Sequence, residues 1–285
     1  MMGKICKDRV YLSSPVLLIV IIQTSLHTAT MRMPLIFLLL QYSLAQTLAL
    51  QCTQVPGKLK QIDAGVGQVF GVNDAGNIYT LYGRSWVQLP GLLKHVSVGP
   101  AGIWGTNNGN NIYKLVGGDW VQVPGLLKQV DAGGDQIVSG ANMNDAIFCM
   151  GREGAVQFKG PGSPTPWQGI PGALKYYTCG PKSCWGVNSN DDIYIMKDVT
   201  DKNCMGSKSW QNIPGKLSMI EVATDGSVYG VNKEGDIYRR DGITDSAPAG
   251  TAWTAVSICM KSKHVSFDLG HLWVITQDGS ILDCV

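Results

Sequence analysis

The hydrophobic and polar positions of this chain alternate in short stretches that predict β-strands separated by tight turns. In the clearest copy, four such stretches cover residues 94–98, 103–107, 111–115 and 120–123. Gly, Pro and Asn residues separate them, and Gly and Asn tolerate the positive φ angles of tight turns. Four short antiparallel strands in about 40–45 residues are typical of one blade of a β-propeller.

The same unit recurs along the chain with shared marker residues. The markers are a Trp, then Pro-Gly-x-Leu, then Gly-Val-Asn and then Ile-Tyr, with some substitutions. The Pro-Gly pairs begin at Pro56, Pro90, Pro124, Pro171 and Pro214, at intervals of 34, 34, 47 and 43 residues. A sixth, degenerate copy keeps Trp253 and residues 263–266 but has lost Pro-Gly. Helical periodicity is absent, so the repeats predict an all-β fold, a six-bladed β-propeller.

The two ends of the chain predict how the ring closes. The first outer strand, residues 52–55, precedes the first complete blade, and the last blade ends after its third strand, residues 280–284. The N-terminal strand can therefore supply the fourth strand of the last blade, which removes an open sheet edge. This pairing places Cys52 beside Cys284, and a disulfide between them would stabilise the ring by about 4–5 kcal/mol.

The other cysteines after residue 49 predict two more disulfides and one free thiol. Cys179 and Cys184 flank a turn within one blade, so they are expected to pair. Cys149 and Cys204 lie in neighbouring blades and can pair across them, which leaves Cys259 as the expected free thiol. A zinc site at Cys179 and Cys184 is disfavoured, because no His or second Cys pair follows at ligand distance.

The first 49 residues differ in composition from the repeats. An apolar run at residues 34–40 follows Arg32 and precedes small residues. This arrangement is typical of a secretory signal peptide, here at about residues 31–49. Residues 1–49 are therefore predicted to be a leader, and the protein is predicted to be secreted and extracellular.

The same segment bears on where translation starts and on whether the chain carries a membrane anchor. We interpret Met31 or Met33 as the start, and residues 1–30 as an upstream extension. The alternative, a signal anchor at residues 15–22, is too short for the roughly 20 apolar residues that a membrane span requires. The expected mature protein is one domain, residues 50–285, without a membrane span.

Charge excludes some classes of partner. Of the 285 residues, 15% are charged, below the roughly 25% of typical globular proteins. Without the leader, the 23 Lys and Arg residues fall to 19 and the 21 Asp and Glu residues to 20, a formal charge of −1. A near-neutral chain with no basic cluster disfavours binding to nucleic acid or to an anionic membrane surface.

Two of the repeated motifs resemble a known family. Trp-x-x-Ile/Val-Pro-Gly-x-Leu-Lys and Gly-Val-Asn-x-x-x-x-Ile-Tyr resemble the tectonin repeat, and residues 127–136 and 218–227 resemble the secreted egg lectins of the tectonin family. The resemblance covers residues 50–285. It implies a six-bladed propeller that binds N-acetylglucosamine-type sugars and microbial surface glycans such as lipopolysaccharide, in defence of eggs or mucosa. Close relatives carry a further Cys where this chain has Thr276, which agrees with an unpaired Cys259.

Candidate sugar-binding residues lie in the turn after the second strand of each blade. They are Asn73, Asp74, Asn107, Asn142, Asp145, Asn188, Asp191 and Asn232. Planar amides and carboxylates can bind pairs of sugar hydroxyls, and these turns are expected on one face of the ring. The alternative is that these residues only build the turns, because Asn and Asp tolerate the left-handed conformation and bond to nearby backbone.

Three further sets of residues carry weaker hypotheses. The Trp residues that recur on the outer strand are interpreted as packing between blades rather than as sugar platforms; they are Trp86, Trp120, Trp167, Trp210 and Trp253. The Lys residues at the start of the inner strand are either solvated or ring the mouth of a channel facing lipid phosphates; they are Lys60, Lys94, Lys128, Lys175 and Lys263. The insertions at residues 151–166 and 198–209 are hypothesised to carry specificity.

Catalysis and metal binding find little support. His95, His264 and His271 lie in separate contexts, and no Gly-x-Ser-x-Gly motif is present, so the chain is predicted not to be an enzyme. No cofactor is expected; the oxygen-rich segment at residues 188–192 is a weak candidate for calcium, since it lacks EF-hand spacing.

Two functions of different classes remain. The first is a secreted lectin, whose repeated sites and expected homodimer would add avidity. The alternative is a non-catalytic propeller that binds an egg or yolk protein without reading sugar.

Overall fold

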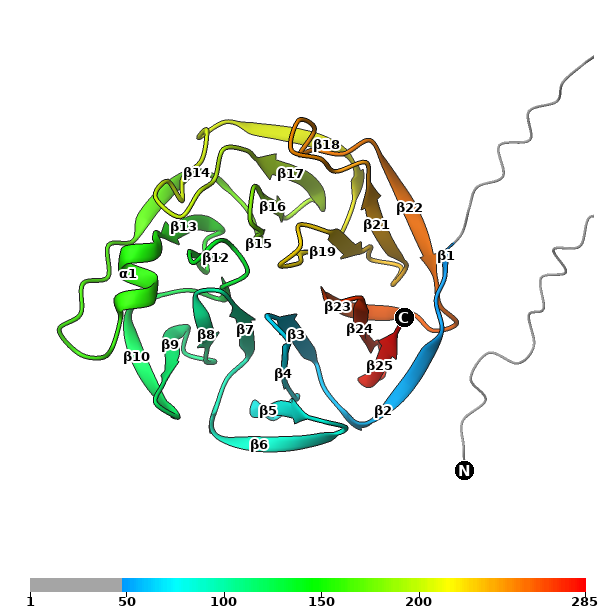
Figure 1. Cartoon of the computed structure of the whole chain (residues 1–285), viewed down its shortest axis with the longest axis horizontal. Coiled ribbons are helices and arrows are strands. Elements are labelled where there is room, and N and C mark those ends of the chain that lie inside the picture. The colour runs from blue at the N-terminus through cyan, green and yellow to red at the C-terminus, as the bar shows by residue number, and fades with distance from the viewer. Residues whose placement is uncertain (1–47) are drawn as a thin grey trace, which may run out of the picture. The chain divides into compact units, whose positions relative to one another are not determined.

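Six antiparallel sheets surround a common centre in the computed structural model, which describes residues 48–285 (Figure 1). Five sheets have four strands, and the sheet of blade 5 gains a fifth. The prediction of an all-β, six-bladed propeller is confirmed. Among the described residues, the one α-helix is α1 (Arg152–Gln157), which lies in the insertion of blade 3.

The strands follow the repeats in order from the inner to the outer edge of each blade. Blade 1 comprises β3 (Gln61–Gly65), β4 (Gln68–Val72), β5 (Asn77–Tyr82) and β6 (Ser85–Leu92). Blade 2 comprises β7 (His95–Gly99), β8 (Gly102–Thr106), β9 (Asn111–Val116) and β10 (Asp119–Leu126). Blade 3 comprises β11 (Gln129–Asp131), β12 (Val138–Ala141), β13 (Ala146–Met150) and β14 (Gln168–Ala173). Blade 4 comprises β15 (Tyr176–Cys179), β16 (Cys184–Val187), β17 (Asp192–Met196) and β18 (Trp210–Lys216). Blade 5 comprises β19 (Met219–Val222), β20 (Val228–Val231), β21 (Ile237–Asp241) and β22 (Ala252–Ser257). Blade 6 contains β23 (Ser262–Asp268), β24 (His271–Thr276) and β25 (Ser280–Cys284).

The outer strand of blade 6 comes from the other end of the chain. Strand β2 (Cys52–Lys58) pairs antiparallel with β25, as expected for the N-terminal strand, and Cys52 lies opposite Cys284. These two cysteines form a disulfide across 232 residues of sequence. Strand β1 (Leu48–Ala49) pairs in parallel with β22 of blade 5. The rest of the predicted leader, residues 1–47, lies outside the described residues, and its boundary stays a prediction.

Disulfides account for all seven cysteines of the described part. Cys149 bonds to Cys204 and Cys179 to Cys184, as the sequence predicts. Cys259 is also disulfide-bonded, so the prediction of a free thiol is wrong. The prediction came from counting only the seven cysteines after residue 49, whereas the full chain has eight, an even number.

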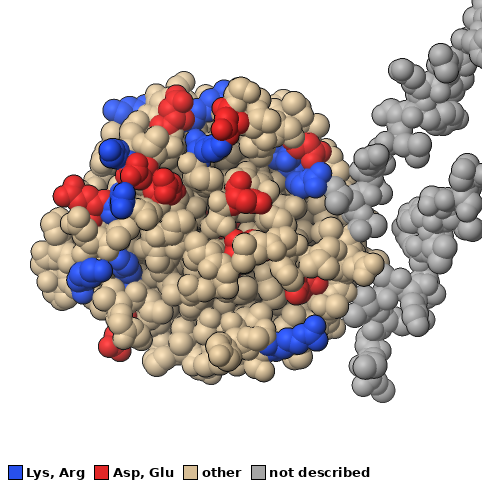
Figure 2. All heavy atoms as spheres, viewed as in Figure 1, with Lys and Arg blue, Asp and Glu red and all other residues tan. Residues whose placement is uncertain are grey.

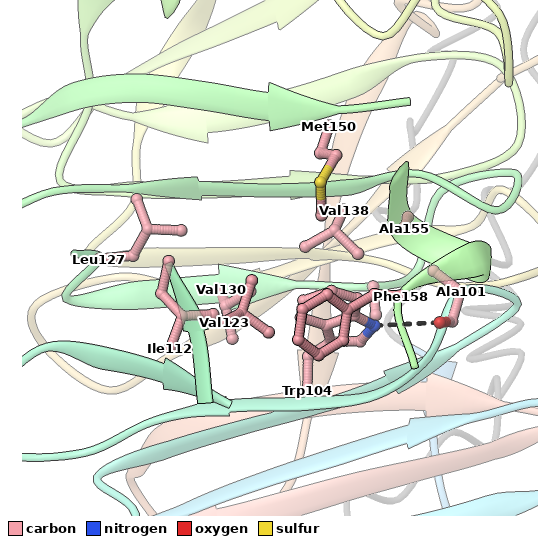
Figure 3. Close-up of a cluster of buried hydrophobic side chains, with 11 residues drawn as sticks. Ala101, Trp104, Ile112, Val123, Leu127, Val130, Val138, Met150, Ala155 and Phe158 are labelled. Carbon is pink, nitrogen blue, oxygen red and sulfur yellow. Dashed lines mark hydrogen bonds between the residues drawn. The ribbon is translucent and has the colours of Figure 1, made fainter. Parts of the chain in front are cut away.

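The two insertions contribute to the hydrophobic core. Phe158, which follows α1, and Ala155 within α1 pack against Trp104 of blade 2, and all three are at most 1% exposed (Figure 3). The Trp104 indole donates a hydrogen bond to the carbonyl of Ala101 at 3.0 Å. In blade 4, Cys204 lies in a second buried cluster and ties its insertion to blade 3. Both insertions therefore complete the core, and their role in specificity stays a hypothesis.

Polar side chains of the inner strands connect neighbouring blades at the centre of the ring. Among them are Asp63, Ser97, Asp131, Thr178 and Ser266, each of which accepts a backbone N–H from the next blade. All five are at most 5% exposed. Buried polar groups require such partners, so these bonds help to fix each blade against its neighbour.

Candidate functional site

The predicted Asn residues form the turns between the second and third strands of their blades. Each side-chain oxygen accepts the backbone N–H four residues later, at 2.8 to 3.0 Å. The five residues that do so are Asn73, Asn107, Asn142, Asn188 and Asn232. Their amide oxygens are therefore committed to turn formation, as the alternative interpretation predicts.

The predicted Asp residues at the ends of these turns meet lysines of the same blade. Asp145 pairs with Lys128 and Asp191 pairs with Lys175. In blade 2 the equivalent position is Asn110, which accepts a hydrogen bond from Lys94. Asp145, Asp191 and Asn110 all have φ near +65°, which Asn and Asp adopt more readily than other non-Gly residues. The eight predicted residues are thus distributed over the turns of five blades, and the structure does not gather them into one site.

A different set of contacts recurs where neighbouring blades meet. The Gly of each Pro-Gly pair has a positive φ and lies against the indole of the next blade; the pairs are Gly57 with Trp86, Gly91 with Trp120, Gly125 with Trp167, Gly172 with Trp210 and Gly215 with Trp253. We call these five places the Gly–Trp junctions. An ideal Cβ on Gly215 would lie 3.3 Å from Nε1 of Trp253, so a larger residue would crowd the indole.

The Gly–Trp junction formed by Gly215 and Trp253, between blades 4 and 5, contains a pocket of about 210 Å³. Blade 4 supplies Gly215 and Lys216 among its lining residues, and blade 5 supplies Asn232, Tyr238 and Trp253. The pocket therefore combines two aromatic rings with an amide and an ammonium group. Its volume fits one small polar ligand with an apolar face rather than an extended chain.

The indoles of the Gly–Trp junctions differ from the other three tryptophans in exposure. All five junction tryptophans are partly exposed, whereas Trp104, Trp185 and Trp273 are at most 6% exposed. At three junctions the indole donates to the Pro carbonyl of the preceding blade, as Trp253 does to Pro214 at 3.1 Å. At the other two, Nε1 of Trp86 and Nε1 of Trp120 are buried without a partner among the described residues.

The turn Asn and a third-strand Tyr complete this arrangement. The Asn107 amide donates to the Tyr113 hydroxyl at 3.3 Å, and Asn73 makes the same contact with Tyr79 at 3.5 Å. In these two blades the predicted Asn therefore contacts an aromatic residue, whereas the amides of Asn188 and Asn232 donate to Asp192 and Asp236. Aromatic faces bind the C–H surface of a sugar ring, while amide and hydroxyl groups bind its hydroxyls.

The boundary between blades 5 and 6 lacks this chemistry although its backbone is equivalent. The N–H of Ser262 donates to the carbonyl of Gly235 at 2.9 Å, as Leu217 does to Asp191 at the preceding boundary. No Pro-Gly pair precedes Ser262, and Cys52 occupies the outer-strand position that holds Trp elsewhere. The ring thus closes without a Gly and Trp at this place.

The sequence predicted that the recurring tryptophans pack between blades, and each of the five packs against core residues of the preceding blade. The tyrosines were not selected from the sequence. A signal was present, because the Ile-Tyr pair and the Trp recur at fixed distances from Gly-Val-Asn. Residues that repeat for packing and residues that repeat for binding look alike in a sequence. The five junction indoles pack against the blades and are also partly exposed, so part of each ring faces solvent.

The expected lysine ring is largely engaged with the turns. Burial lowers the pKa of Lys94, and the charges of Lys60 and Lys128 lower it further. Burial also lowers the pKa of Lys60, with a smaller contribution from Lys263 and an opposing one from Asp74. Three of the lysines contact residues of the Asn turns: Lys94 donates to Asn110, Lys128 pairs with Asp145 and Lys175 pairs with Asp191.

The described residues contain neither a metal-ligand cluster nor a membrane-spanning helix. Within residues 48–285, no group of three His, Cys, Asp or Glu side chains could hold a metal ion. In the segment suggested for calcium, Asp191 pairs with Lys175 and Asp192 with Lys216. The calcium hypothesis stays untested. No helix in the described part has the length and apolar character needed to cross a bilayer.

Comparison with known proteins matches the repeat region to one family. The model of the Tectonin domain matches residues 58–277. Fish-egg lectin of Cyprinus carpio is 61% identical over 237 residues, which cover 83% of this chain and 99% of the carp protein. Tectonin-1 of Physarum polycephalum is 40% identical over 62 residues, which cover 22% of this chain and 24% of that protein.

Solved structures share the fold at low sequence identity. A gluconolactonase from Xanthomonas campestris superimposes with a TM-score of 0.59 and 8% identity, over 82% of this chain and 89% of that structure. At this identity the likeness extends to the fold alone, because propellers host many unrelated functions.

Proposed function

The chain belongs to the tectonin family, and from that premise we propose that it is a secreted, non-catalytic lectin. Its ligands are N-acetylglucosamine-type sugars and microbial surface glycans such as lipopolysaccharide, which it recognises in the defence of eggs or mucosa. The observation that carries the proposal is the recurrence of a partly exposed indole beside a Gly at five places in one ring. The 61% identity to a carp protein named as a lectin supports it independently.

Each Gly–Trp junction is proposed to hold one sugar. The indole supplies the apolar surface for the C–H face of the ring. In the pocket at Gly215 and Trp253, the hydroxyl of Tyr238 and the second N–H of the Asn232 amide are the polar groups available to the sugar hydroxyls and acetamido group. The Asn232 oxygen and its other N–H already bond to Asp236.

Several equivalent sites on one ring can compensate for weak binding at each site. Single shallow pockets bind a monosaccharide weakly, but several of them on one ring raise the avidity for a surface that displays many sugars. A homodimer would double the number of sites, and this remains part of the proposal. Three disulfides among described residues support an oxidising, extracellular location.

Calorimetric titration of residues 48–285 with N-acetylglucosamine tests the function. We expect saturable binding at sugar concentrations from micromolar to millimolar, unchanged by a calcium chelator. D-glucose, which lacks the acetamido group, is the matched control and should bind more weakly. Absence of heat from a protein shown to be folded would favour the alternative, a propeller that binds an egg or yolk protein without reading sugar.

A further inference from the structure

The Gly and the indole repeat at all five Gly–Trp junctions, but the residue that follows the Gly differs between them. In the pocket at Gly215 and Trp253 this residue is Lys216, which lines the pocket. Its ammonium group donates to the Asp192 carboxylate at 2.5 Å and to the carbonyl of Asn190 at 2.9 Å. Hydrogen bonding from Lys216 lowers the pKa of Asp192, so a charged pair stands beside this pocket.

The residue at this position divides the six blade boundaries into a charged half and an uncharged half. At three consecutive boundaries it is a Lys paired with an Asp; these residues are Lys216, Lys261 and Lys58. At the other three it is uncharged; these residues are Leu92, Leu126 and Ala173. Leu92 and Leu126 are 62% and 50% exposed. Charge is also uneven over the face shown in Figure 2, where acidic and basic residues gather near β17 to β22 of Figure 1 and the region of β4 to β6 is mostly uncharged.

The junction of Trp167, between blades 2 and 3, combines two apolar replacements. By strand register, Leu126 stands where Lys216 lines the pocket between blades 4 and 5. Phe148 stands where Tyr238 lines that pocket. Phe148 and Trp167 pack against the same core cluster, and both stay partly exposed. Leu126, Phe148 and Trp167 thus offer apolar surface without a charge or a hydroxyl group.

The indole N–H of this junction is already used within the protein. Nε1 of Trp167 donates to the carbonyl of Pro124 at 2.9 Å, as Nε1 of Trp253 donates to Pro214 at 3.1 Å. Each of these two indoles therefore contributes only its apolar surface to a ligand. The two junctions form a matched pair that differs in the groups around the ring.

The Asn142 amide is the polar group left available at the Trp167 junction. Its oxygen accepts the N–H of Asn144 at 2.9 Å and that of Ala146 at 3.0 Å, which fixes the orientation of the amide. In the other four turns the amide nitrogen donates to a Tyr hydroxyl or an Asp; these residues are Asn73, Asn107, Asn188 and Asn232. Blade 3 has Phe148 and Ala146 at those acceptor positions, and within residues 48–285 the Asn142 amide donates to no other group.

We propose that the Trp167 junction takes an amino sugar whose N-acyl chain is longer than acetyl. This inference rests on the lectin function proposed above and names the ligand class of one of its sites. The Asn142 amide donates to the acyl carbonyl, and the chain lies against Leu126, Phe148 and Trp167. The corresponding Asn, aromatic residue and Trp line one pocket between blades 4 and 5, so a single ligand can reach all of these groups. There, Lys216 and Tyr238 put polar groups where the chain would lie.

Titration of the 15N-labelled protein with N-acetylglucosamine and with N-butanoylglucosamine tests the site. The indole Nε1–H signals give a separate affinity for each junction. At Trp167 the butanoyl sugar should bind about fivefold more tightly than the acetyl sugar, because two further methylene groups are buried. At Trp253, in the same sample, the ratio of the two affinities should stay near one. Equal ratios at the two junctions would overturn the proposal.

An exchange of residue pairs between the two junctions locates the specificity. Leu126→Lys with Asn111→Asp gives blade 2 the charged pair of blade 4, and should lower the affinity ratio at Trp167 toward one. The reverse exchange, Lys216→Leu with Asp192→Asn, should raise the ratio at its own junction at least about twofold. Both pairs already occur at equivalent places in the ring, so the fold should accept them. Ratios that do not follow the exchanged residues would contradict the proposal.

A third variant tests the available amide. Phe148→Tyr introduces the residue found in the other blades, and its hydroxyl can accept the Asn142 N–H as Tyr113 accepts that of Asn107. The affinity for the butanoyl sugar at Trp167 should fall severalfold. An unchanged affinity in the folded variant would show that neither the amide nor the apolar ring takes part.

The same titrations separate this proposal from the lectin proposal. If neither sugar shifts any junction indole, the lectin proposal fails and this one fails with it. If N-acetylglucosamine binds while Trp167 shows no preference for the butanoyl sugar, only the acyl-chain site is wrong. If the Leu126→Lys, Asn111→Asp variant dissociates a dimer and leaves the ratio unchanged, the exposed leucine is a contact between copies, and the acyl-chain site is again wrong.

Discussion

The outer rim of the ring repeats the same chemistry, whereas the inner wall changes from blade to blade. At the rim, five boundaries place a Gly against the indole of the next blade. At the centre, carboxyl groups and hydroxyl groups alternate around the ring: Asp63, Ser97, Asp131, Thr178, Glu221 and Ser266 occupy equivalent positions of blades 1 to 6. Acidic residues thus belong to the odd blades and hydroxyl residues to the even blades.

The outer rim and the inner wall are under different structural constraints. The carboxyl of Asp131 accepts the N–H of Cys179 at 2.8 Å, and the hydroxyl of Ser97 accepts the N–H of Ala132 at 2.9 Å. Both residue types therefore provide the same acceptor to the next blade, so closure of the ring tolerates either. The boundary between blades 5 and 6 closes without a Gly–Trp pair, so closure does not require the repeated indoles. Their recurrence at the rim is consistent with a ligand.

The largest loss of stability is expected on removal of the disulfide that joins β2 to β25 and closes the ring. Replacement of Cys52 and Cys284 by Ser should lower the free energy of unfolding by about 5 kcal/mol, since this bond closes a loop of 232 residues. The control, Cys179→Ser with Cys184→Ser, opens a loop of 5 residues and should cost about 2 kcal/mol. Urea unfolding of both variants measures the contrast, and equal losses would show that closure by β2 does not limit stability.

A tryptophan at the rim is expected to affect binding more than a neighbour on the same strand. Trp120→Ala should weaken N-acetylglucosamine binding at its own junction by about 2 kcal/mol, as for buried aromatic anchors. Val121→Ala is the matched control, because Val121 is also partly buried on β10 but lies outside the Gly–Trp contact. A site-resolved titration that finds the junction of Trp120 equally affected in both variants, or unaffected in both, would contradict the rim site.

The inner wall predicts a pH dependence that the rim does not share. Burial raises the pKa of Asp63 to about 6 and that of Asp131 to about 8, and it raises that of Glu221 well above its ordinary value. The folded protein therefore holds protons that the unfolded chain releases near pH 4. This stabilisation is fully present below that pH, declines as the pH rises, and is lost from Asp131 as the pH passes about 8.

The free energy of unfolding, measured between pH 7 and pH 9, tests the direction of this pH dependence. Each retained proton should lower the free energy of unfolding by up to about 1.4 kcal/mol per pH unit, and Asp131→Asn should reduce the slope. Burial lowers the pKa of His95 and His264, which opposes stability at acidic pH, so the test is placed above the ordinary range of His. A wild-type stability that is flat with pH, or an unchanged slope in Asp131→Asn, would contradict buried protonation at the centre.

The smallest expected effect separates turn formation from ligand binding at Asn107. Asn107→Asp keeps an oxygen to accept the N–H of Asn111, so stability should change by less than about 0.5 kcal/mol. It loses the amide N–H that donates to Tyr113, and sugar affinity at that junction should fall by about 1 kcal/mol. Asn107→Ala loses both interactions and should cost about 1 kcal/mol in stability as well. Equal stability of the two variants would mean that the turn does not need this acceptor.

The fold was predictable because each repeat carries its own turn signals. Pro-Gly and Asn-x-x-x turns define the strand ends, and the leftover strand at residues 52–55 predicts closure by the N-terminus. The three disulfides within the described part followed from that register. Cys259 was misassigned because the count of cysteines after residue 49 is odd, and strand register gives no information on the pairing of a cysteine in a loop.

The candidate site was predicted only in part. The Asn residues were found, but a sequence does not show that their amide oxygens are used within the turns. Nor does it show that Trp253 remains partly exposed beside Gly215 while Trp185 is buried, since both tryptophans recur at regular places. The alternation at the centre was visible only after the inner strands were aligned, because acids and hydroxyls have no common sequence pattern.

Sugar binding at the Gly–Trp junctions can be followed through the NMR signals of the indole N–H groups. The protein contains eight tryptophans, of which five lie at the junctions and three are buried. During a titration with N-acetylglucosamine, we predict saturable shifts of the Nε1–H signals of Trp86, Trp120, Trp167, Trp210 and Trp253, with those of Trp104, Trp185 and Trp273 unchanged. Shifts confined to the three buried indoles, or no shift of any junction indole while binding occurs, would contradict the account.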